Sequence, residues 1–344
     1  MSIIISLLII NIIIVIHEGG HCLIAKKSGI AVKEFFVGVG PDIISIEKGG
    51  TKYALKLIPF GGACVFDGMF EESDNPSAYL NSPVWRRIAT VLAGPFMNFF
   101  LSFFLALFVI GIVGIDKPVI AEVMPGYPAS EAGISAGDEI VKLDNKRIEI
   151  YRDISLEGMF STGKSVRVTY KHDGLLKETV LTPRYSKEDG RYLFGFRGPK
   201  EYVKGNPLEV VKYSIVETRY WIEATVKSLG LIFKGKVTKD DFAGPVGVTK
   251  VVGDVYEASK PSGIFYIFLN LMNLTILLSA DIGVMNLLPL PALDGGKFLF
   301  LLFEAVTGKK PSPRFEGVVQ FAGMCLLLVF VIFITFNDIT RFFR

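Results

Sequence analysis

The chain has little charge, few cysteines and few histidines. Only 21% of its 344 residues are charged, whereas 50% are hydrophobic, and the mean hydropathy is +0.45. These values lie outside the usual range of soluble globular proteins and predict a membrane protein. The net charge of +3 is scattered and forms no basic face, so we expect no nucleic-acid partner.

The scarcity of cysteine excludes two further classes. Cys22, Cys64 and Cys325 lie in or beside apolar stretches without a paired spacing, which argues against a disulfide framework and a Cys-based zinc finger. We expect buried free thiols. Residues 1–16 also lack the basic segment and the small-residue cleavage site of a signal peptide, so we interpret them as mature structure.

Long apolar runs are what the chain does have. Crossing about 30 Å of hydrocarbon takes about 20 helical residues. We place spanning helices within residues 1–27, 88–115, 261–296 and 317–340. The third is less regular, because Asp281 interrupts it and two prolines follow. The predicted fold class is therefore a mainly α membrane protein with four transmembrane helices.

Lysine and arginine set the expected orientation. The loops between spans, 28–87 and 297–316, carry several of them near the predicted helices, and we therefore place both loops on the cytoplasmic side. The N-terminus and residues 117–260 then lie outside. Within residues 28–87, apolar runs alternate with glycine-rich stretches, which predicts β-hairpins. These form either a re-entrant sheet beside a polar cavity or a peripheral cytoplasmic hairpin.

The outer segment divides into two parts. Residues 117–199 show alternating runs separated by Gly-Asp, Asp-Asn and Asp-Gly turns, which predict a small β-rich domain. Residues 200–260 contain an amphipathic helix and a connector, and this helix lies on the membrane surface or packs on the domain. Its apolar positions recur at intervals of three, four and seven: Leu208, Val211, Ile215, Ile222, Val226, Leu229 and Phe233.

His17, Glu18 and His21 form a His-Glu-x-x-His motif in the first span. On a helix the two imidazoles lie about one turn apart and can bind the same ion, with Glu18 beside it. This geometry suits zinc, which lowers the pKa of a bound water to about 7, and Glu18 would take the proton of that water. The alternative is interfacial histidines without an ion, which would bury polar groups at a high cost.

A catalytic zinc usually has a third protein ligand. His172 lies in a Lys-His-Asp-Gly turn of the outer segment, where we expect a solvated side chain. The carboxylates at membrane depth are Asp281 and Asp294. We prefer Asp294, because two prolines and two glycines fix a turn around it at the cytoplasmic end of its span. The alternative for Asp294 is a carboxylate in a helix-breaking turn.

Several motifs together resemble the bacterial site-2 proteases, which are intramembrane zinc metalloproteases, and the resemblance covers nearly the whole chain. The outer residues 117–199 resemble a PDZ domain. A PDZ groove accepts a strand or a carboxyl terminus, but we favour a lid that excludes substrates with bulky outer domains. The family motifs lie at residues 17–29, 36–41, 93–98, 241–247, 286–296 and 336–338, and the PDZ-like motifs at 121–133 and 136–144.

The resemblance implies both a site and substrates. The substrates would be single-span proteins of the bacterial plasma membrane, such as anti-sigma factors and signal-peptide remnants. The active site would lie near the cytoplasmic side of the lipid bilayer, and the β region would contact the substrate. The implied residues are His17, His21 and Asp294 as zinc ligands, Glu18 as the catalytic acid and base, and Asn286, Pro289 and Pro291 for substrate binding.

Three other functions compete with this one, and two features limit the resemblance to the family. Gly19 and Gly20 place two poor helix formers in the catalytic turn, although the second is usual for the family. Asp281 stands where the family more often has asparagine, and its role is open. An enzyme acting on soluble peptides disagrees with the apolar setting of the ligands. A zinc transporter or metal sensor would need polar residues along several spans. A catalytically silent PDZ adaptor disagrees with the presence of Glu18 and Asp294.

Overall fold

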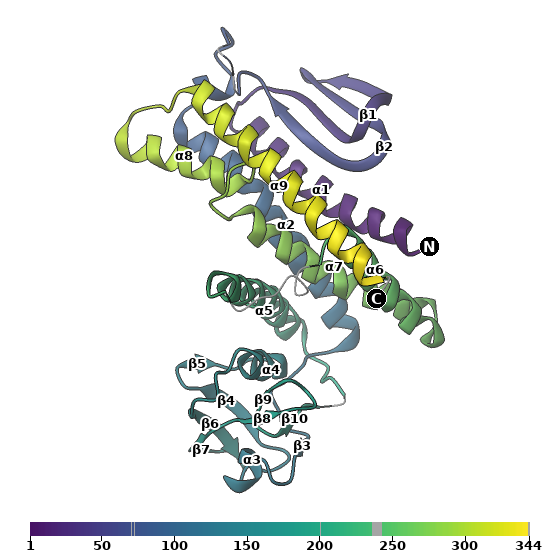
Figure 1. Cartoon of the computed structure of the whole chain (residues 1–344), viewed down its shortest axis with the longest axis vertical. Helices are drawn as coiled ribbons and strands as arrows, with labels where there is room; N and C mark the ends of the chain where they lie inside the picture. The colour runs from purple at the N-terminus through teal and green to yellow at the C-terminus, as the bar shows by residue number, and fades with distance from the viewer. Residues whose placement is uncertain (70, 72, 200, 236–242, 343–344) are drawn as a thin grey trace. The chain divides into compact units, whose positions relative to one another are not determined.

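The computed structural model describes residues 1–69, 71, 73–199, 201–235 and 243–342 (Figure 1). The chain forms two compact units. We call residues 1–105 with 228–344 the membrane unit, and residues 106–227 the β-rich unit. Four of the described helices are long and apolar enough to cross a membrane. The protein is therefore a multi-pass membrane protein with a mainly helical fold.

The four long helices are α1 (Ser2–Lys27), α2 (Val84–Val113), α7 (Ile264–Asn286) and α9 (Pro313–Phe342). α2 starts four residues before the expected range, because its first turn includes two arginines that the search for apolar runs left out. On α9, Cys325 is exposed, which corrects the expectation that all three thiols are buried.

The third span ends earlier than expected. α7 stops at Asn286, and a new helix, α8 (Asp294–Thr307), follows the proline-containing segment 287–293. Much of the expected loop at 297–316 is therefore helical. The turn before α8 is tight: a Cβ atom on Gly295 would overlap the carbonyl groups of residues 287 and 288. This turn explains why glycine follows Asp294.

A β-sheet lies beside α1 (Figure 1). It consists of β1 (Val32–Lys48) and β2 (Thr51–Phe66), which are antiparallel, with a 3-10 turn, η1 (Tyr79–Asn81), after them. The first half of β1 lies between two halves of β2, because Phe36 pairs with both Ala54 and Ala63. The Asn11 side chain on α1 donates to Pro59 O and accepts the Gly61 N–H at 3.1 Å. One amide thus attaches the sheet to the middle of α1.

A shorter helix, α6 (Pro245–Ser259), packs against α1, α7 and α9. Its Val252 is fully buried in a cluster with residues of α1. Asp338 on α9 is buried and accepts the Gly247 N–H at 2.7 Å, so a carboxylate stabilises the start of this helix. A 3-10 turn, η3 (Lys260–Ser262), leads to α7. In the motif at 241–247, residues 241 and 242 lie outside the described part of the chain.

The β-rich unit has a four-stranded antiparallel sheet in the order β5, β4, β6, β7, and its core consists mainly of buried aliphatic residues. The unit also has two separate two-stranded sheets, β10 with β3 and β8 with β9. Its elements are β3 (Glu122–Val123), α3 (Pro128–Glu131), β4 (Glu139–Leu143), β5 (Lys146–Arg147), α4 (Tyr151–Met159), β6 (Val166–His172), β7 (Leu175–Leu181), β8 (Arg184–Ser186), β9 (Arg191–Leu193) and β10 (Phe196–Arg197).

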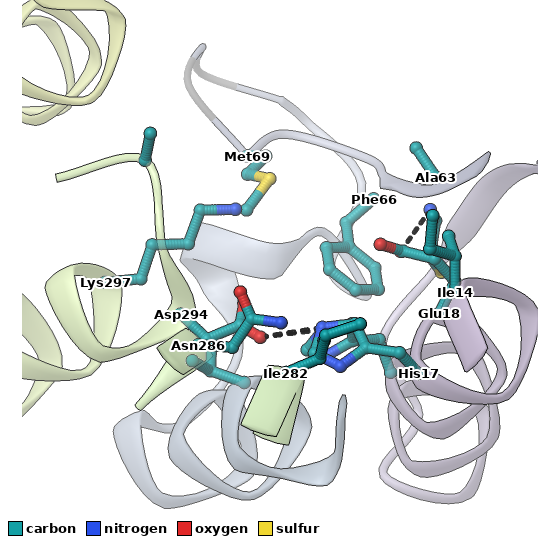
Figure 2. A pocket seen from close by; sticks show the side chains of 14 residues that line it. Ile14, His17, Glu18, Ala63, Phe66, Met69, Ile282, Asn286, Asp294 and Lys297 are labelled. Atoms are coloured by element: carbon teal, nitrogen blue, oxygen red, sulfur yellow. Dashed lines mark hydrogen bonds and ion pairs between the residues drawn. The ribbon is translucent and has the colours of Figure 1, made fainter. Parts of the chain in front are cut away.

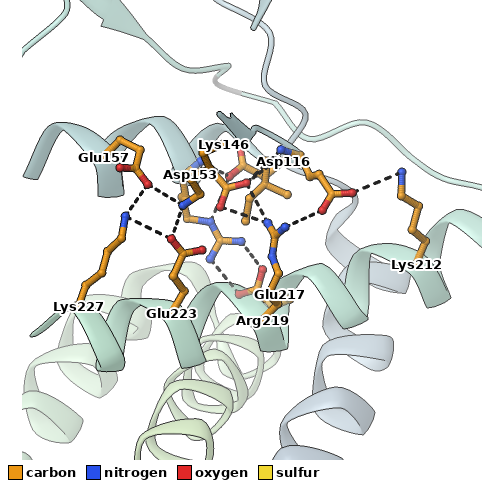
Figure 3. Close-up of polar contacts among 12 residues, drawn as sticks. Asp116, Lys146, Asp153, Glu157, Lys212, Glu217, Arg219, Glu223 and Lys227 are labelled. Carbon is orange, nitrogen blue, oxygen red and sulfur yellow. Dashed lines mark hydrogen bonds and ion pairs between the residues drawn. The ribbon is translucent and has the colours of Figure 1, made fainter. Parts of the chain in front are cut away.

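The expected amphipathic helix is α5 (Pro207–Phe233), and it packs on the β-rich unit. Val216 and Tyr220 join the buried cluster around α4, whereas Leu208 and Ile215 on another face are exposed. A network of ion pairs adds to this contact (Figure 3). Most of the predicted apolar series therefore lies on the open face, since Leu208, Val211, Ile215 and Val226 are exposed, and the helix packs through residues outside that series. The network residues include Asp116, Lys146, Glu149, Arg152, Asp153, Glu157, Lys212, Glu217, Arg219, Glu223 and Lys227.

The pKa values in this network follow its pairing. Burial alone would lower the pKa of Lys146, but its hydrogen bonds with Glu157 and Glu223 raise it. Burial would raise the pKa of Glu223, but Lys146 and Lys227 lower it. For Asp116, burial outweighs the effect of Arg152 and raises the pKa. Lys146 and Glu223 therefore stabilise each other's charged forms near neutral pH.

Candidate metal centre and active site

α1 and α8 bring three potential metal ligands together. His17 and His21 are each 6% exposed. Asp294 Oδ2 lies 3.0 Å from His17 Nε2 and 3.2 Å from His21 Nε2, and the two imidazole nitrogens lie 3.2 Å apart. Among the described residues, this is the one group of three or more such side chains that could hold a metal ion. The structure thus places together three residues from opposite ends of the sequence.

The chemistry of these atoms fits zinc. His21 Nδ1 lies 2.8 Å from Thr90 O, and because a carbonyl only accepts, Nδ1 carries the proton and Nε2 keeps a lone pair. Asp294 Oδ2 is buried and forms no hydrogen bond with the described residues. Two acceptors therefore converge, which is unfavourable without a cation. The spacing of 3.0–3.2 Å is close to the roughly 3.3 Å between ligands of tetrahedral zinc.

α2 forms the wall behind the two imidazoles. Thr90, Gly94 and Asn98 recur at intervals of four residues and so lie on one face of the helix. Asn98 Nδ2 lies 3.2 Å from His17 Nδ1. A Cβ atom on Gly94 would overlap the His21 ring and come within 2.8 Å of His17 Cε1. The sequence-based site omitted these three residues, although their spacing matches the four-residue interval of the histidines.

A buried ion pair anchors the helix that carries Asp294. Arg87 on α2 is 2% exposed, and its Nη1 donates to Glu304 Oε2 on α8 at 2.9 Å, while Nη2 donates to Oε1. Leu301, also on α8, belongs to a buried cluster with Cys22 of α1. These contacts fix α8 against α1 and α2, and thereby fix where the carboxylate at its first residue lies.

The three ligands open into a cavity of about 280 Å³ (Figure 2). Glu18 lies on its wall, and Glu18 Oε2 accepts the N–H of Cys64 on β2 at 2.9 Å. In Figure 2, Asn286 and Asp294 lie close to the imidazole of His17. The cavity therefore combines a metal-ligand set, a carboxylate and a carboxamide. The rest of its lining is Ile14, Ala63, Cys64, Phe66, Met69, Val91, Ile282, Ala292 and Lys297.

The other residues singled out from the sequence lie elsewhere. Pro289 and Pro291 line a separate apolar cavity of about 410 Å³ between α8 and α9. Asp281 is on α7 but outside the lining of the cavity in Figure 2. His172 ends β6 in the β-rich unit, where its Nδ1 lies 2.8 Å from the buried Asp138 Oδ1. It is therefore partnered and partly buried, rather than fully solvated as expected.

Buried histidine and aspartate side chains that could hold a metal ion, beside a glutamate in a protein with four candidate membrane-spanning helices, are typical of membrane-embedded metalloproteases. Comparison with known proteins agrees. The family model described as peptidase family M50 matches residues 5–330. The chain belongs to this family, the site-2 proteases, and is a zinc metalloprotease.

Three relatives illustrate the extent of the similarity. A protein of Clostridium acetobutylicum is 36% identical over 98% of this chain and 97% of its own length. A protein of Fusobacterium nucleatum is 33% identical over 100% of both chains. Zinc metalloprotease RasP of Geobacillus kaustophilus is 30% identical over 99% of this chain and 98% of its own length. The names of all three contain the words zinc metalloprotease.

Proposed function

We propose that the protein hydrolyses peptide bonds within or next to the transmembrane segments of single-span membrane proteins. The observation that carries this proposal is the buried group of His17, His21 and Asp294 in a cavity that Glu18 also lines. Polar groups on membrane helices are costly and mark functional sites. A substrate segment that reaches this cavity is most simply one that is itself in the membrane.

The residues divide the chemistry between them. When bound to His17, His21 and Asp294, zinc supplies a Lewis acid that lowers the pKa of a water to about 7 and polarises a carbonyl. Glu18 accepts the proton of the attacking water and passes it to the leaving amine. The Cys64 N–H holds the Glu18 carboxylate at the cavity wall. The mechanism thus uses one carboxylate as a ligand and another as acid and base.

The substrate backbone must be opened before water can attack, because a transmembrane helix satisfies its amides internally. Asn286 lines the cavity and offers both a donor and an acceptor to an opened backbone. In the sheet beside α1, the second half of β2, which ends at Phe66, offers an edge for strand addition. Pro289 and Pro291 act indirectly, since they shape the segment that connects Asn286 to Asp294.

Orientation and substrates complete the proposal. We place segments 28–87 and 297–316 at the cytoplasmic side of a bacterial plasma membrane and the β-rich unit outside. The bond from Asn11, in the middle of α1, supports a re-entrant sheet. Residues 117–199 act as a PDZ-like lid that excludes bulky outer domains. Anti-sigma factors and signal-peptide remnants, which resemblance to the site-2 proteases suggests, have the required single span.

Cleavage of a reporter transmembrane segment by the purified full-length protein tests this function. We expect Glu18→Gln to abolish cleavage and to keep bound zinc, because glutamine still accepts the Cys64 N–H and leaves the three ligands in place. A soluble peptide of the same sequence serves as the control substrate. Equal cleavage by parent and variant would contradict the proposal, and a preference for the soluble peptide would contradict its intramembrane part.

A further inference from the structure

Asn98 contacts the first of the candidate zinc ligands from α2. Its Nδ2 lies 3.2 Å from His17 Nδ1, and the residue is 0% exposed. Its Oδ1 is also buried and has no hydrogen-bond partner among the described residues. A buried amide oxygen without a partner is destabilising. A physical reason for this arrangement is therefore required.

The protonation of the imidazole favours the opposite orientation of the amide, in which Oδ1 has a partner. An imidazole that binds zinc through Nε2 carries its proton on Nδ1 and needs an acceptor there. His21 already has one, the carbonyl oxygen of Thr90 at 2.8 Å. His17 has no such acceptor while Asn98 Nδ2 faces it, because an amide nitrogen only donates. A half-turn of the planar amide exchanges its two ends and brings Oδ1 to His17 Nδ1.

We propose that Asn98 is the positioning residue of His17. Its amide oxygen accepts the Nδ1 proton, which fixes the tautomer and the ring orientation that present Nε2 to zinc. The backbone is held for this role, since Ser279 Oγ donates to Asn98 O at 2.8 Å. Gly94, one turn earlier, leaves room for both rings. This inference rests on the proposed ligation of zinc by His17.

The zinc affinity of the purified full-length protein, measured by competition with a chelator, tests the proposal. Asn98→Leu has a similar volume but no acceptor, and we expect zinc to bind roughly 10–100-fold more weakly. Asn98→Asp keeps an acceptor at the same place, and we expect an affinity equal to or above that of the parent. A leucine variant with parental affinity, or an aspartate variant as weak as leucine, would overturn the proposal.

Two controls separate the possible failures. Ser102→Ala removes another 0% exposed side chain of α2, whose Oγ donates to Ile276 O at 3.2 Å, and we expect parental zinc affinity. If Ser102→Ala weakens zinc binding as much as Asn98→Leu, the effect is general destabilisation and the proposal fails. His17→Ala tests the ligand itself. If His17→Ala loses zinc while Asn98→Leu keeps the parental affinity, the role of Asn98 is rejected and the proposed function is unaffected.

A direct measurement of the tautomer does not depend on any variant of Asn98. The chain has three histidines, so nitrogen NMR of the zinc-loaded protein with isotope-labelled histidine gives few signals, and His172→Gln assigns the third. We expect His17 and His21 both to carry the proton on Nδ1. A zinc-loaded protein in which His17 carries its proton on Nε2 would overturn the proposal.

Discussion

The membrane unit and the β-rich unit each bury a cluster of ionisable side chains, and the two clusters are built differently. In the β-rich unit, Arg152 pairs with Asp116 and Glu217. Arg219 pairs with Asp153 (Figure 3). In the membrane unit, Asp294 Oδ2 lies 3.0 Å from His17 Nε2 (Figure 2) and 3.2 Å from His21 Nε2. One cluster is balanced within the protein, and the other requires an added cation.

This difference separates stability from function. Buried charges with partners hold two elements together, and removing one partner leaves the other uncompensated. Converging acceptors destabilise the metal-free form, and they become favourable when a metal ion binds. We therefore expect substitutions in the two clusters to have separate effects, the first on unfolding and the second on zinc.

The largest expected effect is that of Asp294→Asn on zinc. The variant keeps the shape of the side chain but removes the charge, so we expect zinc to be lost on purification, beyond the 10–100-fold typical for residues that only support a ligand. Elemental analysis of the purified protein measures the bound zinc. Asp281→Asn on α7 is the matched control and should keep zinc. If Asp294→Asn keeps the zinc content of the parent, the cluster around Asp294 is not a zinc site and the contrast between the two clusters fails.

Arg152→Met should affect the other cluster. It leaves Asp116 and Glu217 buried without their partner, and we expect the β-rich unit to lose about 3 kcal/mol of unfolding free energy, with zinc unchanged. Urea unfolding followed by Trp221 fluorescence, in a Trp85→Phe background, reports this unit, because Trp221 donates to Glu217 at 2.8 Å.

The exposed pair of Arg197 with Glu122 provides the control for that substitution. Arg197→Met should cost no more than about 1 kcal/mol, since solvent screens such pairs. Equal losses in the Arg152 and Arg197 variants would mean that burial of the charges is not what makes the cluster stabilising.

A smaller effect is expected for Gly94→Ala. The added methyl group would displace both imidazoles, and we expect zinc to bind roughly 10–100-fold more weakly because the ligands are misoriented. Gly19→Ala is the matched control on α1, where nothing described lies within 4 Å of the added atom. That variant should keep zinc and stabilise the helix by up to about 1 kcal/mol. Similar zinc affinities in both variants would contradict the close packing of α2 on the site.

The part of the site that the sequence predicts is local in the chain or rare in composition. The spacing of His17 and His21 fixes their common face as soon as the segment is helical. Asp294 could be selected because carboxylates are scarce at membrane depth. The four spans can likewise be predicted, because their length and apolar composition are local properties of the chain. Such inferences need no knowledge of how the helices pack.

The rest depends on packing between distant segments. The pair of Arg87 with Glu304 joins residues 217 positions apart, and nothing in either neighbourhood indicates it. The role of Asn98 depends on how α1 crosses α2. Asn11 did leave a signal, since it is a polar residue in an otherwise apolar run, but its partners on β2 could not be inferred from the run. α8 was missed because 14 residues are too few for a span.

The separation of the ligands along the chain has a consequence for biosynthesis. His17 and His21 leave the ribosome early, whereas Asp294 follows only after the β-rich unit and α7 have been made. If the proposed ligation holds, a nascent chain has two of the three zinc ligands for most of its synthesis and binds zinc weakly. Under the same proposal, proteolytic activity requires α8 to have docked, so an incompletely inserted chain is inactive.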